Sequence, residues 1–221
     1  MNTLNEISHI TPFDKNIFSE LGFDENESNT YMSKCLLDQF LIENSYPLNY
    51  KKFNIFWRVS DEYGILHNMA STPITHNDIM WNSSEALYQA MKFNPNIESD
   101  NLIIHKIFSQ KSPYMSKKCI SDSDSSFIRK DFHDIKISIM LEILYLKYLQ
   151  NKASLNSVLF KNSYHFIEAS AKDTIWGASP VTINGLKILK GCNVLGKLWE
   201  YIKVGNVPNT TYLNNFNFKL G

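Results

Sequence analysis

The sequence predicts a single α+β domain in which helices predominate and the strands are short. The longest periodic segment, residues 133–150, carries apolar residues over much more than one stripe, as expected of a helix at the centre of a core. Runs of β-branched and aromatic residues are short, as in residues 53–59. With 221 residues, the chain is long enough to bury a core without disulfides or a structural metal.

The first half of the chain alternates helices with short strands. We expect a helix over residues 29–43, which ends before Tyr46-Pro47, in a polar N-terminal extension of residues 1–52. A strand over 53–59 is followed by a turn at 61–64 and by a second short strand around 71–75.

The middle of the chain is predicted to be mostly helical. Asn82 is the expected N-cap of a helix that runs to about Phe93 and stops before Pro95. A helix follows over 100–108, Ser112-Pro113 opens another, and the serine- and aspartate-rich residues 121–126 form a solvated loop.

After the long helix, we expect a short segment at 153–161 and a strand at 164–169. A loop then runs from Trp176-Gly177 to Gly191, and the last helix spans residues 193–203. The main domain is therefore assigned to residues 53–203. Residues 204–221 form an asparagine-rich tail with no clear pattern.

The charge balance excludes a global field that attracts a polyanion. Acidic and basic residues number 22 each, so an anionic ligand must be held by local groups. Arg58 and Arg129 are the only arginines. Each is either a planar fork for a phosphate or the partner of a carboxylate, and the sequence leaves both interpretations open.

Neither a metal nor an organic cofactor is predicted. Three widely spaced cysteines and six histidines form no recognised metal-binding spacing. The N-terminal residues lack a basic segment followed by an apolar run, and no apolar run reaches the length of a membrane span. We therefore expect a cytoplasmic protein with no signal peptide and no membrane contact.

The densest cluster of polar groups lies in residues 81–93. On a helix, Glu85, Gln89 and Lys92 share one face, with about 10 Å of axial rise from the first to the last. A ligand fits between a carboxylate and an amine at that separation. The alternative is that Glu85 completes a cap and the face is ordinary solvent-exposed surface.

A second cluster follows the strand expected at 164–169. Glu168 lies at the end of that strand, and Asp173 and Trp176 follow in a loop, where a carboxylate beside an aromatic face suits a stacked base. Alternatively, Asp173 caps a turn and Trp176 fills the core.

A third segment, residues 191–196, places a glycine just ahead of a helix start, where free backbone N–H groups could receive a phosphate. This signal is weak, and Cys192 is expected to be packed rather than nucleophilic because nothing beside it marks a base.

Taken together, these segments resemble the NADAR (YbiA-like) family. The resemblance rests on ordered motifs spanning about residues 53–203: Tyr63-Gly64 with His67 to Met69, then W-x-S-S-E-x-x-Y-Q-A-x-K-F (Trp81 to Phe93), Ser112-Pro113, Arg129, Glu168 with D-x-x-W-G (Asp173 to Gly177), and G-C-N-x-L-G (Gly191 to Gly196).

The resemblance implies a YbiA-like fold and an N-glycosidase that cleaves a C–N bond between ribose and a nitrogenous group. Removal of ADP-ribose from guanine in nucleic acid is the favoured reaction. The alternatives are cleavage of phosphoribosylamino-pyrimidine intermediates of riboflavin synthesis and non-catalytic binding of ADP-ribose or a related nucleotide. A transient contact with nucleic acid is also expected.

The resemblance further assigns roles to residues. Glu85 would be the acid and base, Lys92 either a Schiff-base amine or a cation for a phosphate or hydroxyl, and Asp173 and Glu168 would orient the ribose or a water. The expected substrate-binding residues are Arg58, Tyr63, Gly64, Asn68, Trp81, Ser84, Tyr88, Gln89, Arg129, Trp176, Gly177 and Asn193.

Two departures from the family pattern bear on the substrate. His67 and Met69 stand where the family usually has Ser and Phe, and residues 1–52 have no counterpart in the minimal domain. The extension could cap the pocket, form a dimer surface or bind a partner. A protein-interaction factor built on the enzyme fold is therefore a third interpretation.

Overall fold

The structure is a computed structural model that describes residues 45–47, 53–183, 186–208, 211–218 and 220. The helix expected over 29–43 lies outside the described residues. The chain divides into two compact units. Of the described residues, the first unit holds 68–156 and those from 207 onward, and the second unit holds 45–47, 53–67 and those from 157 to 206.

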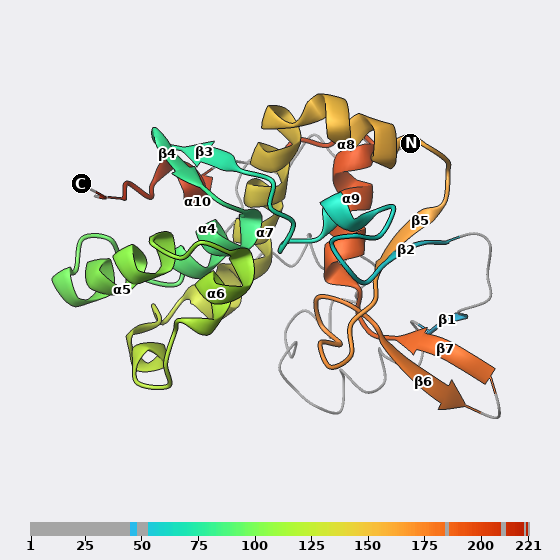
Figure 1. Cartoon of the computed structure of the whole chain (residues 1–221), viewed down its shortest axis with the longest axis horizontal. Coiled ribbons are helices and arrows are strands. Elements are labelled where there is room, and N and C mark those ends of the chain that lie inside the picture. Colours follow the sequence, from blue (N-terminus) through green and yellow to red (C-terminus); the bar gives the residue numbers. More distant parts are fainter. Residues whose placement is uncertain (1–44, 48–52, 184–185, 209–210, 219, 221) are drawn as a thin grey trace. The chain divides into compact units, whose positions relative to one another are not determined.

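Four helices form the body of the first unit (Figure 1): α4 (Ser84–Ala90), α5 (Glu98–Phe108), α6 (Pro113–Lys118) and α7 (Phe132–Gln150). Helix α4 contacts each of the other three, so it lies at the centre of this unit. Ser112 caps α6 by accepting a hydrogen bond from the Met115 N–H at 3.3 Å, as the sequence predicted.

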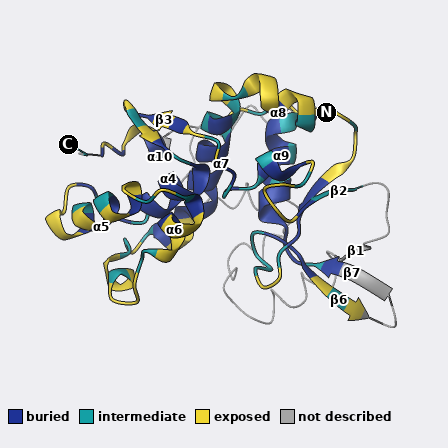
Figure 2. Cartoon of the chain, in the orientation of Figure 1, coloured by how far each residue is buried: buried dark blue, intermediate teal, exposed yellow. Residues whose placement is uncertain are grey.

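Helix α7 confirms the predicted core helix, and most of its length is buried (Figure 2). Its apolar residues are inaccessible all round the first three turns, which explains the absence of a narrow apolar stripe. The same helix also buries Glu142 and Lys147 completely. Two buried charged groups on one helix must each be neutralised or hydrogen-bonded.

A short antiparallel hairpin joins β3 (Ile74–His76) to β4 (Ile79–Trp81). The linking residues Asn77 and Asp78 have φ values of 49° and 61°, in the left-handed region that Asn and Asp tolerate best. The sequence analysis anticipated only the first of these two strands, around 71–75.

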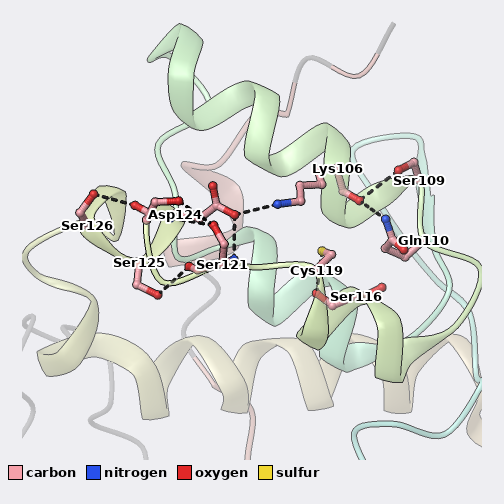
Figure 3. A network of polar contacts seen from close by, with 10 residues as sticks. Lys106, Ser109, Gln110, Ser116, Cys119, Ser121, Asp124, Ser125 and Ser126 are labelled. Atoms are coloured by element: carbon pink, nitrogen blue, oxygen red, sulfur yellow. Dashed lines mark hydrogen bonds and ion pairs between the residues drawn. The ribbon is translucent and has the colours of Figure 1, made fainter.

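The segment predicted to be an irregular loop at 121–126 contains the 3₁₀ helix η2 (Asp124–Phe127). Asp124 orders it by accepting hydrogen bonds from the Lys106 amine and the Ser121 N–H, both at 2.8 Å (Figure 3). These contacts lower the pKa of Asp124 to about 2, with the Lys106 hydrogen bond as the largest cause.

The C-terminal segment is structured, contrary to the prediction of a patternless tail. Helix α10 (Thr211–Asn214) contacts α7. Leu213, Phe216 and Phe218 are buried in the first unit. The sequence concealed this because three apolar residues spaced among asparagines show neither helical nor strand periodicity.

In the second unit, β2 (Phe53–Phe56) pairs in parallel with β5 (His165–Glu168), and α9 (Val194–Lys203) contacts β5. Gly64–Leu66 form the 3₁₀ helix η1, and α8 (Lys152–Leu159) begins in the first unit and ends in the second. Gly196 allows α9 to approach β5, since a Cβ there would lie 2.2 Å from the Phe166 carbonyl oxygen.

A hairpin stands where the sequence analysis placed a loop between residues 177 and 191. Strands β6 (Ser179–Ile183) and β7 (Leu186–Lys190) are antiparallel, and β7 also pairs with β1 (Ser45–Pro47). The missed signal was the sequence Asn184-Gly185 between two β-prone runs, which is the strongest short-range indicator of a hairpin. Among the described residues, no helix is long and apolar enough to cross a membrane.

Candidate functional site

The start of α4 differs from the prediction by one residue. Ser83, not Asn82, is the N-cap, and its hydroxyl accepts a hydrogen bond from the Ala86 N–H at 3.1 Å. Asn82 instead donates to the Gln110 carbonyl at 2.9 Å. Glu85 is therefore too close to the cap to close a capping box, so its carboxylate is not used to start the helix.

Glu85 is buried, with 5% of its surface exposed. Its carboxylate accepts a hydrogen bond from the Gln89 amide at 2.7 Å, one helical turn further on. Glu85 and Gln89 thus lie side by side, as expected, but both are buried rather than exposed to solvent. The alternative interpretation, that this helix face is ordinary solvent-exposed surface, is wrong.

Lys92 lies just beyond the end of α4, which stops at Ala90 rather than at Phe93 as predicted. Its amine is 5.8 Å from the centre of the Tyr88 ring and 5.7 Å from that of Phe132. Burial lowers the pKa of Lys92, and the nearby cations Lys117 and Lys136 lower it further, whereas Glu85 raises it. A depressed pKa favours the neutral, nucleophilic amine.

Lys117 and Lys136 were not identified from the sequence. They lie on α6 and α7, far from Lys92 along the chain, and Lys136 is 8% exposed. The sequence signal for Lys136 was a charged residue between the apolar residues near the start of the long helix. With Lys92 they form a local group of cations in a chain that has no net charge.

Several predicted binding residues in the first unit hold buried polar atoms that have no hydrogen-bond partner among the described residues: Asn68 Oδ1, Trp81 Nε1, Ser84 Oγ and Gln89 Oε1. Buried polar atoms in folded proteins are nearly always paired, so each of these four atoms around one short helix is a candidate contact for a ligand or a bound water. Trp81 also has a structural role, because its ring packs edge-on against Phe108 and Phe218.

The second unit brings together a different pair. The Glu168 carboxylate lies 3.4 Å from His67 Nε2, and 8% of Glu168 is exposed. Glu168 ends β5 directly opposite Phe56 of β2, as expected of a carboxylate at a strand end. His67 follows η1, so this pair depends on packing between segments that are distant in sequence.

Asp173 caps a turn, as one of the two interpretations proposed. Its carboxylate accepts hydrogen bonds from the N–H groups of Ile175 at 3.1 Å and Trp176 at 2.9 Å. Trp176 is only half-buried, so it does not fill the core. Gly177 is required by packing, since a Cβ there would lie 2.6 Å from the Glu168 carbonyl oxygen.

The phosphate site expected at the start of α9 is not supported. The backbone N–H groups of residues 192–195 donate to the carbonyls of residues 174–177 at 2.8 to 3.1 Å, so they are already paired. The Asn193 side chain accepts from the Glu168 N–H at 2.9 Å and donates to the Phe166 carbonyl at 2.8 Å. Asn193 is therefore a link between α9 and β5 rather than an open ligand contact. Cys192 is buried, as expected.

The two arginines differ in their surroundings. Arg129 pairs with Asp131 through two hydrogen bonds of 2.6 and 2.5 Å, whereas the exposed Arg58 guanidinium forms no hydrogen bond or ion pair with the described residues. Tyr63 is buried and its hydroxyl accepts from Asn162 at 3.1 Å. Gly64 permits the tight turn, because a Cβ there would lie 2.3 Å from the Val59 carbonyl oxygen.

The predicted site residues thus fall into two groups. The first unit holds Glu85 and Lys92 with Asn68, Trp81, Ser84, Tyr88, Gln89 and Arg129. The second unit holds Glu168 and Asp173 with Arg58, Tyr63, Gly64, Trp176, Gly177 and Asn193. No group of three or more His, Cys, Asp or Glu residues suited to a metal ion occurs in the described part of the chain.

Comparison with known proteins identifies the family. The NADAR domain model matches residues 55–204, which is more than half of the chain. The chain belongs to the NADAR family. The match includes both groups of site residues and ends before the C-terminal segment 211–218.

Three relatives and structures illustrate the similarity of this NADAR chain. It is 30% identical over 144 residues to the N-glycosidase YbiA of Shigella boydii, covering 65% of this chain and 81% of that protein. It is 29% identical over 122 residues to the riboflavin biosynthesis protein VVA0006 of Vibrio vulnificus, 55% of this chain and only 32% of that longer protein.

The solution structure of Escherichia coli YbiA matches with a TM-score of 0.56 and 26% identity, covering 72% of this chain and 86% of that one. The α+β, YbiA-like fold predicted from the sequence is thereby confirmed.

Proposed function

We propose that this NADAR protein is an N-glycosidase that cleaves the C–N bond between ribose and a nitrogenous base in a nucleotide-like substrate. The observation that carries the proposal is Glu85. It is a buried carboxylate that neither caps its helix nor pairs with an arginine, and that is held in place by Gln89 at 2.7 Å. Relatives of this chain are named N-glycosidases, which supports the same reaction.

The chemistry follows from the charge that develops as the bond breaks. The ribose gains oxocarbenium character while the leaving nitrogen needs a proton. Glu85 in its acid form supplies that proton, and as a carboxylate it stabilises the cationic ribose. Gln89 orients the carboxyl group for this role, because its amide leaves the carboxylate one preferred hydrogen-bonding geometry.

Lys92 has a role in the same step. The nitrogen of its neutral amine bonds to C1′ as the bond from C1′ to the base breaks, and the ribose ring then opens to an imine. Water hydrolyses the imine, which restores the amine and leaves C1′ as the aldehyde of the released sugar. The burial that lowers the pKa of Lys92 supports this route. In the alternative, the charged amine binds a phosphate or hydroxyl.

The substrate class follows from the cations around Lys92. Lys117 and Lys136 both act electrostatically on Lys92 in a chain with no net charge, and these two cations favour a ligand with a phosphate group. We propose ADP-ribose attached to guanine as the substrate. The phosphoribosylamino-pyrimidine is the second candidate, because one relative is named a riboflavin biosynthesis protein.

The test is mass spectrometry of the products formed from ADP-ribosylated guanine DNA and, separately, from the phosphoribosylamino-pyrimidine. Glu85→Gln and Lys92→Ala are expected to lower turnover by about 100-fold or more, as for loss of an acid-base group or nucleophile. Lys111→Ala is the matched control, since Lys111 is exposed and lies outside the site. If product forms from only one of the two compounds, that compound is the substrate.

Two further measurements separate the alternatives. Reduction with borohydride during turnover attaches the sugar to Lys92 if an imine forms, and leaves the protein mass unchanged if Lys92 only binds phosphate. Glu168→Gln and Asp173→Asn test the second unit in the same assay. Absence of turnover of both substrates, with tight binding of ADP-ribose retained, would refute the enzyme and support a nucleotide-binding module.

A further inference from the structure

The C-terminal segment of residues 211–218, here called the strap, lies beyond the family match, which ends at residue 204. It packs into the first unit, where Leu213, Phe216 and Phe218 are 4%, 8% and 7% exposed. Removing three large apolar side chains from water stabilises the packed position of this segment. The strap is therefore an integral part of this unit.

Hydrogen bonds fix the strap at both ends. At its start, the Glu142 carboxylate of α7 accepts from the N–H groups of Tyr212 at 3.2 Å and Leu213 at 2.8 Å. Further on, the Phe216 carbonyl accepts from Asn77 Nδ2 at 2.8 Å and lies 3.0 Å from His76 Nε2. A segment held at both ends places the Phe216 ring at a defined position.

Phe216 lies against Arg129. The guanidinium carbon lies over the Phe216 ring, 5.1 Å from its centre, while Asp131 accepts hydrogen bonds from Nε and one terminal nitrogen. An arginine held by an aromatic ring and by a carboxylate has little freedom left. Asp131 is the N-cap residue of α7, directly before Phe132, so the contact also fixes the start of that helix.

Arg129 connects this contact to Lys92. The Arg129 N–H donates to the Lys92 carbonyl at 2.9 Å. The first residue of α7, Phe132, places its ring 5.7 Å from the Lys92 amine. The turn from Arg129 to Phe132 thus holds Lys92 by its backbone and covers its side chain.

We propose that the strap positions Lys92 through Arg129, with Phe216 as the positioning residue. The inference deepens the proposed function, since it concerns the amine assigned to the reaction, but the contacts do not depend on the substrate. Removing the Phe216 ring frees the Arg129 turn, and Phe132 then covers the Lys92 amine less completely. The charged groups that act on Lys92, namely Glu85, Lys117 and Lys136, stay unchanged by this substitution.

The experiment measures the reactivity of Lys92 itself. Competitive acetylation with isotopically labelled acetic anhydride, read by mass spectrometry from pH 6 to 11, gives the midpoint at which the Lys92 amine becomes reactive. In Phe216→Ala the midpoint should move upward by about one pH unit, because greater solvation stabilises the charged amine. At a pH below the midpoint this is about a tenfold loss of reactive amine.

The matched control lies in the strap. Phe218→Ala removes a ring of the same size and similar burial that contacts the rings of His76, Trp81 and Phe216, whereas the Arg129 guanidinium lies over Phe216. The Phe218→Ala substitution should leave the Lys92 midpoint unchanged. Phe216→Tyr, which keeps the ring, should have the same midpoint as the wild-type protein. If the alanine variant does not fold, the Lys92 midpoint is measured in Phe216→Leu instead, because leucine keeps the apolar volume without the ring.

Equal shifts in the Phe216 and Phe218 variants would mean that the strap acts only by general packing, and would overturn the proposal. So would an unchanged Lys92 midpoint in a folded Phe216→Leu protein. Because acetylation needs no substrate, a failure of the N-glycosidase assay leaves this result interpretable. Conversely, activity lost in Phe216→Ala without a shift in the Lys92 midpoint refutes the proposed role of the strap but not the proposed N-glycosidase activity.

Discussion

Glu142→Gln tests the buried carboxylate that anchors the strap. Glu142 is fully buried in α7, and burial raises its pKa from 4.5 to about 7 although two backbone N–H groups partly oppose this shift. Glutamine has the same shape and carries no charge at any pH, but its single carbonyl oxygen accepts from only one of the two N–H groups, because each bonds a different carboxylate oxygen. The substitution therefore removes the titration while leaving the packing close to its original state.

The sign follows from proton binding. Between pH 4.5 and about 7 the folded chain keeps a proton on Glu142 that the unfolded chain has released, so the free energy of unfolding falls as the pH rises through this range. The difference between the two pKa values, at about 1.4 kcal/mol per unit, corresponds to about 3 kcal/mol. Glutamine does not incur this loss. The stability of the variant relative to wild type should thus rise by about 3 kcal/mol from pH 4 to pH 8.

The assay is urea denaturation of both proteins at several pH values, because the difference between them cancels every other titrating group. Asp122→Asn is the control, since Asp122 is exposed and its loss should leave the difference nearly flat. A Glu142→Gln difference that does not change between pH 4 and pH 8 would refute the assigned burial. A difference that falls with pH would show that the backbone hydrogen bonds to the carboxylate outweigh its burial.

Two other predictions concern stability. Burial lowers the pKa of Lys147 to about 7, so in this case the free energy of unfolding should rise with pH above 7, and Lys147→Met should stabilise the protein by several kcal/mol at pH 6 but much less at pH 10. Urea midpoints that differ equally at both pH values would contradict this. Ser83→Ala should lower the free energy of unfolding by about 1 kcal/mol through loss of the α4 cap, and an unchanged urea midpoint would show that Ser83 is not the cap.

The local elements that the sequence predicted well are those with strong local signals. Helix α7 and the Ser112-Pro113 start of α6 follow from periodicity and capping chemistry, which depend on neighbours within a few residues. Strands β6 and β7 were missed because the residues between Gly177 and Gly191 were interpreted as a loop. The Asn184-Gly185 dipeptide between two β-prone runs was the signal for a hairpin there.

Of the predicted site residues, Glu85, Gln89 and Lys92 were placed together by helical spacing and family resemblance, and the structure shows the first two in contact. It could not show that the Asn193 side chain links α9 to β5, or that carbonyls of residues 174–177 occupy the N–H groups at the start of α9. Those partners are remote in sequence, and hydrogen-bond pairing between distant segments leaves no periodic signal.

By itself, the sequence determined the α+β class, the family and the residue types available for chemistry, because periodicity, caps and ordered motifs are local or colinear properties. Only the tertiary structure decided the environments of those residues: the burial of Glu85, the lowered pKa of Lys92 and the strap on Arg129. The physical reason is that desolvation and the proximity of charges depend on which distant segments pack together, and these two effects set the reactivity of an ionisable side chain.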